Sequence, residues 1–365
     1  TETNSHLDIP VVGVSRSRLD SVELVPFRAA INSDVSGIMS FHGDMPALDS
    51  SGVPGTLSHK VMTDLLRSDL HFGGMIISDA MDMAGVLKQF GADEAVKRAV
   101  AAGIDVLIQP VDVGKAIDAV VAGVKEGRYS EARLDQSVRR VLELKRSLDL
   151  EHHRTVNIDA LRTIVGDSSH VAVAREIAER SITLVKDSLN EVPLKLSAHP
   201  RVLSITIARR ADLSAGAAFN GELRTALPDL RTEFISSDDP APNYTRLEGL
   251  ADSADVTIVG VYATQTIDAT ASTRTSQSLT GFLQRLSASG KRPVVVSFSD
   301  PYLLRQIPWV PSYVVAWGGF PPSQLAAAKA VLGRIPTVGK LPISIPVGGQ
   351  TIVRGSGIAR SITSR

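Results

Sequence analysis

Short apolar runs alternate with amphipathic stretches from Leu19 to about Leu148. The apolar runs are residues 37–41, 74–78 and 104–108, and runs of this length indicate strands that are buried on both faces of a parallel sheet. Apolar residues recur at helical spacing from Ser58, from Ala92, over 112–126 and over 131–147. The pattern predicts crossover units around a parallel sheet in which three strands can be counted.

Three strands are too few to close a barrel. An open apolar sheet of this size would leave both of its edges unpaired. We therefore expect the first part of the chain to be an incomplete α/β unit.

A second α/β pattern begins near Val171. Strands are expected at 202–207, 255–261, 293–298 and 312–316, alternating with helices near 213–226, 276–289 and 323–332. A polar stretch separates the two patterns. The predicted organisation is a first domain over 1–150, a linker over 151–168 and a second domain over 169–365.

Composition narrows the possible functions. The 365 residues carry 39 basic and 39 acidic side chains and no cysteine. The zero net charge argues against a nucleic-acid-binding protein, and the lack of cysteine excludes disulfides, thiolate metal sites and a thiol nucleophile. No apolar run is long enough for a membrane span, and the composition fits the cytoplasm and export equally well.

Two side chains stand out as candidates for catalysis. Asp79 directly follows the run 74–78, where parallel sheets present functional residues, although an aspartate at that point could also cap a helix. His6 lies in a polar loop, and a solvated histidine is the alternative there. His42 follows the run 37–41 and could contact a ligand or pack in its loop.

Several other residues are given lesser roles. Met83 is expected to line the pocket wall, and Asp82 to start a helix. Asp49 is expected to be a turn residue. The His152–His153 pair is expected to have no aspartate, glutamate or cysteine at ligand spacing, so we expect no metal there.

The order of the motifs resembles a known family. The stretches SHLDIP, LVPFRAAI, MSFH, PALDSSGVPGTLSHKVMTDLLR and GGMIISDAMDM, followed by AREIAERSITLVKDS, SFSDPYLL and GKLPISIP, resemble the bacterial N-acetylglucosaminidase branch of glycoside hydrolase family 3. The resemblance covers nearly the whole chain. It implies an α/β fold, namely the C-terminal half of a (β/α)8 TIM barrel followed by an α/β sandwich domain with a mainly parallel sheet.

The resemblance also implies roles for residues. Asp79 matches the catalytic nucleophile of the family, and His6 matches the general acid/base. Asn4 stands where this branch has an aspartate that partners the histidine, so we expect weakened acid/base catalysis. By comparison, the N-terminal half of the barrel would precede Thr1, and the same protein or a second polypeptide would supply it.

The implied activity is the retaining hydrolysis of terminal β-linked N-acetylglucosamine from peptidoglycan or chitin fragments, without a cofactor or metal. An aspartate is ionised near neutral pH and can attack the anomeric carbon, whereas an imidazole can hold or release a proton there. Two alternatives stay open. One is a phosphorylase of the same family, and the other is a catalytically silent carbohydrate-binding remnant.

Overall fold

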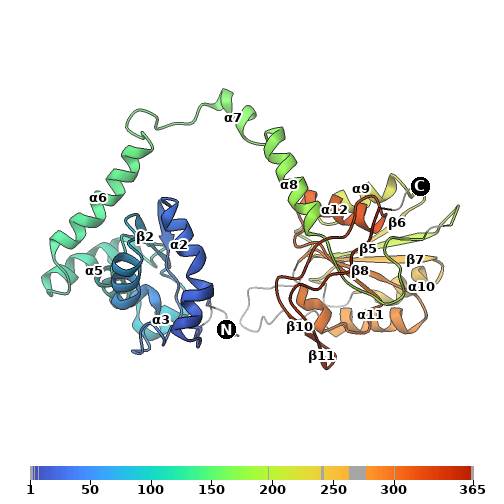
Figure 1. Cartoon of the computed structure of the whole chain (residues 1–365), viewed down its shortest axis with the longest axis horizontal. Helices are drawn as coiled ribbons and strands as arrows, with labels where there is room; N and C mark the ends of the chain where they lie inside the picture. The colour runs from blue at the N-terminus through green and yellow to red at the C-terminus, as the bar shows by residue number, and fades with distance from the viewer. Residues whose placement is uncertain are drawn as a thin grey trace. The chain divides into compact units, whose positions relative to one another are not determined.

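The computed structural model describes residues 3, 5–6, 8–195, 197–239, 242–262, 277–299 and 301–362. The chain forms two compact units, Thr1–Asn157 and Ile158–Arg365 (Figure 1). The division falls inside the stretch 151–168, which also contains a helix, α7 (Ile158–Ile164). Within the described residues, no helix combines the length and the apolar character that a bilayer span requires.

Unit 1 contains a three-stranded parallel sheet in the order β1-β2-β3. The strands are β1 (Gly37–Met39), β2 (Met75–Ala80) and β3 (Val106–Ile108). This confirms the prediction of three parallel strands. The helices are α1 (Arg16–Arg18), η1 (Leu19–Glu23), α2 (Val25–Asn32), η2 (Gly55–Leu57), η3 (Lys60–Asp69), α3 (Ala84–Phe90), α4 (Ala92–Ala102), α5 (Val113–Lys125) and α6 (Glu131–Ser147).

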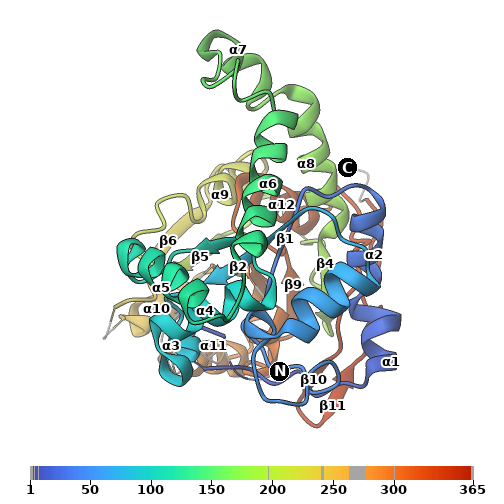
Figure 2. The ribbon, with the colours of Figure 1, turned by 90° about the vertical axis from the view of Figure 1, so that its left-hand side faces the viewer.

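The apolar stripes of these helices build the core of unit 1. The π-helix η3 contributes Val61 and Leu65, and α4 contributes Val96 and Ala99, all of which pack with Ile76 of β2 in one cluster. Helices α4 and α5 lie side by side (Figure 2). The 3.6-residue spacing seen in the sequence is therefore the spacing of buried side chains.

A buried carboxylate holds the amino-terminal end of this sheet. Asp105 has no exposed side-chain surface, and it accepts hydrogen bonds from Arg67 (2.5 Å), Arg140 (2.9 Å) and Ser137 (2.5 Å). It also accepts the N–H of Ile76 at 2.9 Å. The run 104–108 is thus not wholly apolar, because Asp105 precedes the strand and fastens η3 and α6 to it.

Unit 2 contains a six-stranded sheet in the order β4-β9-β8-β7-β5-β6. All neighbours pair in parallel except β4, which runs antiparallel to β9. The strands are β4 (Thr183–Asp187), β5 (Val202–Ala208), β6 (Arg231–Ser236), β7 (Val256–Val261), β8 (Val294–Ser297) and β9 (Ser312–Val315). The four predicted strands are present, and β4 and β6 are additions to the prediction.

Helices cover both faces of this sheet. One buried cluster joins the sheet to α10 (Tyr244–Asp252) and α11 (Gln277–Ala288). A second cluster joins the opposite face to α8 (Ser168–Ser181), α9 (Ala217–Arg224) and α12 (Pro321–Val331). The fold class is therefore α/β with mostly parallel strands, as predicted. The remaining elements are η4 (Pro301–Arg305) and the antiparallel pair β10 (Ile345–Val347) and β11 (Gln350–Ile352).

Candidate active site

Asp79 lies in an irregular stretch at the carboxyl end of β2. Ile77 pairs with Val106 and Ala80 pairs with Ile108, so three steps along β2 face two steps along β3. The extra residue is a β-bulge, a feature that commonly redirects a side chain beside an active site. The Asp79 side chain is consequently presented at the strand end, and the residue is half-buried.

The Asp79 carboxylate does not cap a helix. Helix α3 starts after Met83, and no side chain bonds its first N–H groups. The Oδ1 atom of Asp79 instead accepts the N–H of Ala80 at 2.8 Å. The helix-cap role that the sequence left open for Asp79 is therefore wrong.

A buried polar chain lies directly behind Asp79. The Asp79 N–H donates to Ser40 Oγ at 3.2 Å, and Ser40 Oγ lies 2.8 Å from Thr56 Oγ1. Thr56 Oγ1 is also 2.8 Å from His42 Nδ1, and His42 Nε2 is 3.0 Å from the carbonyl oxygen of Ala80. The chain therefore begins and ends on backbone groups of the nucleophile candidate and its neighbour.

His42 is an internal residue. His42 is 1% exposed, and both of its ring nitrogens form hydrogen bonds within unit 1. Burial lowers the pKa of His42, and this effect outweighs the opposing hydrogen bond to Ala80 and the charge of Asp79. The ring is thus neutral near pH 7 and is oriented toward the protein, which favours a supporting role over a direct ligand contact.

The segment that carries His6 is anchored next to the same strand end. The backbone of Asp8 and Ile9 passes so close to Gly85 of α3 that a Cβ atom there would lie 2.8 Å from the Asp8 carbonyl carbon. Further along, Pro10 O accepts the Asp44 N–H at 2.9 Å, and Val12 N–H donates to Asp44 O at 2.8 Å. His6 is an exposed turn residue that precedes this anchor, whereas Asn4 lies outside the described residues.

Met83 and Asp82 follow Asp79 in the sequence but differ in their surroundings. Met83 is 7% exposed and its N–H donates to Ala80 O, so a wall position for its side chain stays a prediction. Asp82 does not start α3, contrary to expectation. Its Oδ2 accepts a hydrogen bond of 2.8 Å from Gln109 Nε2, and Gln109 has a left-handed backbone with φ of 48°. This contact links the loops after β2 and β3.

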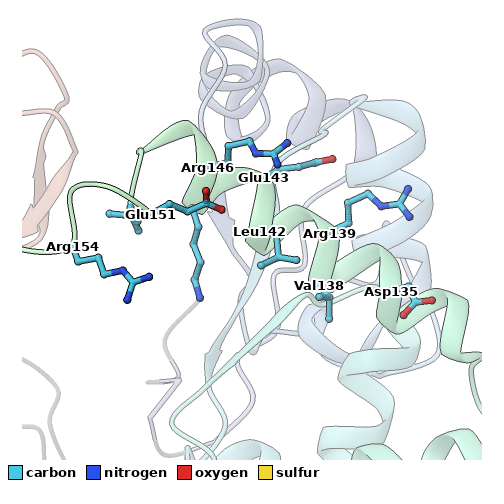
Figure 3. A pocket seen from close by; sticks show the side chains of 10 residues that line it. Asp135, Val138, Arg139, Leu142, Glu143, Arg146, Glu151 and Arg154 are labelled. Atoms are coloured by element: carbon cyan, nitrogen blue, oxygen red, sulfur yellow. The ribbon is translucent and has the colours of Figure 1, made fainter.

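Unit 1 has several hollows, two of which are relevant to where a ligand could lie. One, of about 510 Å³, begins at Met81 and continues between the starts of α4 and α5, where Asp93, Asp112 and Lys115 supply charge. Its volume is typical of a ligand pocket. The other, of about 910 Å³, lies along α6 and includes Val138, Leu142 and several charged side chains (Figure 3). It has no residue from the strand end that carries Asp79.

Asp149 is an acidic neighbour of the histidine pair that the sequence analysis overlooked. Its carboxylate oxygens lie 2.6 Å from His152 Nδ1 and 2.7 Å from His153 Nδ1, and all three side chains are exposed. Across the part of the chain that the structure describes, no three His, Asp or Glu side chains gather as a metal site would require.

Sequence reasoning missed Ser40, Thr56 and Gly85. Nothing in the spacing of Ser40 and Thr56 marks them, because they meet only after the loop between β1 and η3 folds back. Gly85 did carry a signal. A glycine in the first turn of a helix lowers helix propensity, so its presence can indicate a close backbone approach.

The first part of the chain matches a family profile, and nearly the whole chain is similar to known proteins. Residues 1–144 match the profile described as "Glycosyl hydrolase family 3 N terminal domain". A beta-N-acetylglucosaminidase/beta-glucosidase of Cellulomonas fimi is 29% identical over 94% of this chain and 63% of its own length. Beta-hexosaminidase A of Pseudoalteromonas piscicida is 24% identical over 94% of this chain and 64% of its own. The chain thus spans less than two thirds of these relatives.

Solved structures share the fold. A family 3 beta-N-acetylglucosaminidase from a Paenibacillus strain superimposes with a TM-score of 0.82 at 28% identity, covering 95% of this chain and 65% of that one. A beta-glucoside phosphorylase superimposes with a TM-score of 0.76 at 23% identity, covering 95% of this chain and 63% of that one. Both similarities extend over both units of the chain, including the barrel-like unit and the α/β sandwich.

Proposed function

Because this chain is a member of glycoside hydrolase family 3, we propose that it hydrolyses β-linked N-acetylglucosaminides with retention, with Asp79 as nucleophile and His6 as general acid/base. One observation carries the proposal. The Asp79 carboxylate is presented by a bulge at the carboxyl end of β2, and the segment bearing His6 is anchored on Gly85, in the helix that follows.

The proposed reaction has two steps. In the first, an Asp79 oxygen attacks the anomeric carbon while the bond to the leaving oxygen breaks and His6 gives that oxygen a proton. In the second, the neutral imidazole takes a proton from water, and the resulting hydroxide displaces Asp79 from the sugar. Both side chains end in their original protonation states, and the sugar keeps its β configuration.

The proposed substrate class is supported by the names of the relatives. The names of the Cellulomonas fimi enzyme and of the Paenibacillus structure both include N-acetylglucosaminidase activity. We assign the acetamido sugar to this chain on that similarity, with peptidoglycan or chitin fragments as the natural sources. A β-glucoside is the competing sugar, since the Cellulomonas fimi enzyme is also named a beta-glucosidase.

Phosphorolysis is the second candidate reaction. A histidine in place of a carboxylic acid/base leaves one carboxylate at the sugar, so an anionic acceptor meets less repulsion at the glycosyl-enzyme. Phosphate would then attack the anomeric carbon in place of water, releasing the Asp79 carboxylate and a sugar 1-phosphate. The choice between water and phosphate is a matter of relative rates at the second step.

The proposal includes further strands beside this sheet. Among the described residues, β1 and β3 each pair along one edge, which leaves the other edge of each strand without a neighbour. Helix α5 beside β3 exposes an apolar row, with Val113 64%, Ile117 59% and Val121 46% exposed. Additional βα units would pair with those edges and cover that row.

The test is turnover of a fluorogenic N-acetyl-β-glucosaminide. The chain is assayed alone and with a second polypeptide that supplies the remaining βα units of a family 3 barrel. We expect turnover that Asp79→Ala abolishes, and added phosphate to distinguish hydrolysis from formation of a sugar 1-phosphate. Absence of turnover under both conditions would contradict the proposal and support a silent carbohydrate-binding protein.

A further inference from the structure

We propose that Ser40, Thr56 and His42 are positioning residues that hold the strand end bearing Asp79 through a hydrogen-bond chain with one fixed direction. The term "positioning" rests on the proposed function, in which Asp79 is the nucleophile. The existence and direction of the chain do not depend on that function.

The direction follows from the acceptor at one end. The carbonyl oxygen of Ala80 cannot donate, so His42 Nε2, at 3.0 Å, must carry the proton. In the neutral ring, Nδ1 is then an acceptor and receives the Thr56 hydroxyl proton across 2.8 Å. Thr56 Oγ1 therefore accepts from the Ser40 hydroxyl, and Ser40 Oγ accepts the N–H of Asp79.

The hydrogen-bond chain takes the place of a backbone bond that a regular ladder would form between Ser40 and Asp79. Ser40 N–H donates to Ile77 O at 2.8 Å, and in a regular parallel ladder the next bond would join Asp79 N–H to the carbonyl oxygen of Ser40. The Ser40 hydroxyl takes that place instead. On the side of β2 that faces β3, the Ile108 N–H donates to Ser78 Oγ at 2.8 Å. Side-chain hydroxyl groups therefore accept backbone N–H groups on both edges of β2.

Because its members are buried, the hydrogen bonds of this chain depend on one another. Ser40 is 7% exposed, His42 1% and Thr56 0%, so water cannot easily replace a lost partner. Removal of the Thr56 hydroxyl would leave both the His42 Nδ1 atom and the Ser40 hydroxyl without their partners. The lowered pKa of His42 agrees with this arrangement, because burial favours the neutral ring that the chain requires.

The chain also reaches the helix after the strand. The Ala80 carbonyl oxygen accepts from His42 Nε2 and from the Met83 N–H, which immediately precedes α3. Loss of the His42 bond would therefore loosen both the backbone on either side of Asp79 and the start of α3. A small displacement of a nucleophile can lower a rate by up to about 100-fold, which gives the chain a functional consequence.

Two measurements on the protein test the hydrogen-bond chain without any assay of activity. The ¹⁵N NMR shifts of His42 should report the Nε2–H tautomer. The amide proton of Asp79 should exchange at least about tenfold faster in Thr56→Val than in the wild type, and Thr56→Ser, which keeps the hydroxyl, should restore slow exchange. An Nδ1–H tautomer, or equal Asp79 exchange in all three proteins, would overturn the inference.

Kinetics then test the positioning role. Thr56→Val should lower kcat at least about tenfold with little change in KM, and Thr56→Ser should recover most of the loss. If Asp79→Ala abolishes turnover while Thr56→Val retains the wild-type kcat, the positioning inference fails and the proposed function stands. If the wild type has no turnover, the proposed function fails, and the tautomer and exchange data alone decide whether the chain exists.

Discussion

The backbone of Asp8 lies against Gly85, where an added Cβ atom would come within 2.8 Å of the Asp8 carbonyl carbon. The contact joins the segment after His6 to the first turn of the helix that follows Asp79. Together with the hydrogen bonds that Pro10 and Val12 form with Asp44, this contact holds the amino-terminal segment near the strand end where the nucleophile candidate lies. Several consequences of this and of related contacts can be measured.

Gly85→Ala should lower kcat/KM at least about tenfold, because the methyl group displaces the segment that carries His6. Stability should change little, since alanine favours the helix by about 1 kcal/mol and offsets part of the strain. Gly221→Ala in α9 is the matched control, because nothing lies within 4 Å of its Cβ position. Wild-type kinetics in Gly85→Ala would show that the contact does not place His6.

Asn4→Asp should raise the rate on glycosides with poor leaving groups. An aspartate can accept a hydrogen bond from the imidazole and stabilise its protonated form, which an amide does less well. We expect an increase of at least about tenfold for poor leaving groups and a smaller one for activated aryl glycosides. An equal rate for both proteins on an alkyl glycoside would refute the partnership of positions 4 and 6.

Asp105→Asn should destabilise unit 1 by about 3–5 kcal/mol, because it removes a buried charge that three partly buried guanidinium groups surround. The measurement is urea unfolding followed in unit 1. Asp20→Asn is the control in the same unit, since its partners Arg16 and Arg28 are 45% and 44% exposed and exposed ion pairs contribute little to stability. Similar losses in the two variants would contradict the role given to Asp105.

Asp49 should account for part of the loss of folding stability at low pH. Burial alone would raise the pKa of Asp49, but hydrogen bonds from Ser58 and Ser51 outweigh it and lower the pKa to about 2. The folded-state pKa thus lies below the unfolded value of about 3.9, so the stabilisation is present above pH 4 and is lost as the pH falls through 2.

The comparison of wild type with Asp49→Asn measures that part. The stability difference between the two proteins should shrink by about 2 kcal/mol between pH 5 and pH 2. A difference that is independent of pH would mean that the carboxylate titrates normally. The result also bears on the loop after β1, because Asp49 accepts the Ser51 N–H, a local contact typical of a turn aspartate, and is in addition buried and bonded to Ser58.

The sequence predicted the interior strands of unit 2 well, because β5, β8 and β9 are buried throughout and are mostly apolar. The three strands of unit 1 are present as predicted, but they are not buried on both faces, since β3 is only half-buried and Met39 of β1 is 55% exposed. The sequence did not predict β6, whose edge position allows three consecutive polar residues, Arg231, Thr232 and Glu233, at its start. It did not predict β4 either, since that strand follows α8 with a short connection and no turn signal. Both omissions concern the two edge strands of the sheet.

The candidate site was predictable in part. The position of Asp79 follows from the end of an apolar run, a local feature of the sequence. The orientation of His42 depends on Thr56, which is distant in sequence, and on the Ala80 carbonyl, so no local pattern could reveal it. Asp105 was hidden for a related reason, because its arginine partners come from two helices.

The most direct test of the account is covalent trapping of the nucleophile. The chain, together with the polypeptide that supplies the remaining strands, is incubated with a 5-fluoro-N-acetyl-β-glucosaminyl fluoride, digested and analysed by mass spectrometry. The account predicts one added fluorosugar on the peptide that contains Asp79, attached to that side chain, and no added mass in Asp79→Ala. A sugar attached to Asp82 or to any other carboxylate would contradict it.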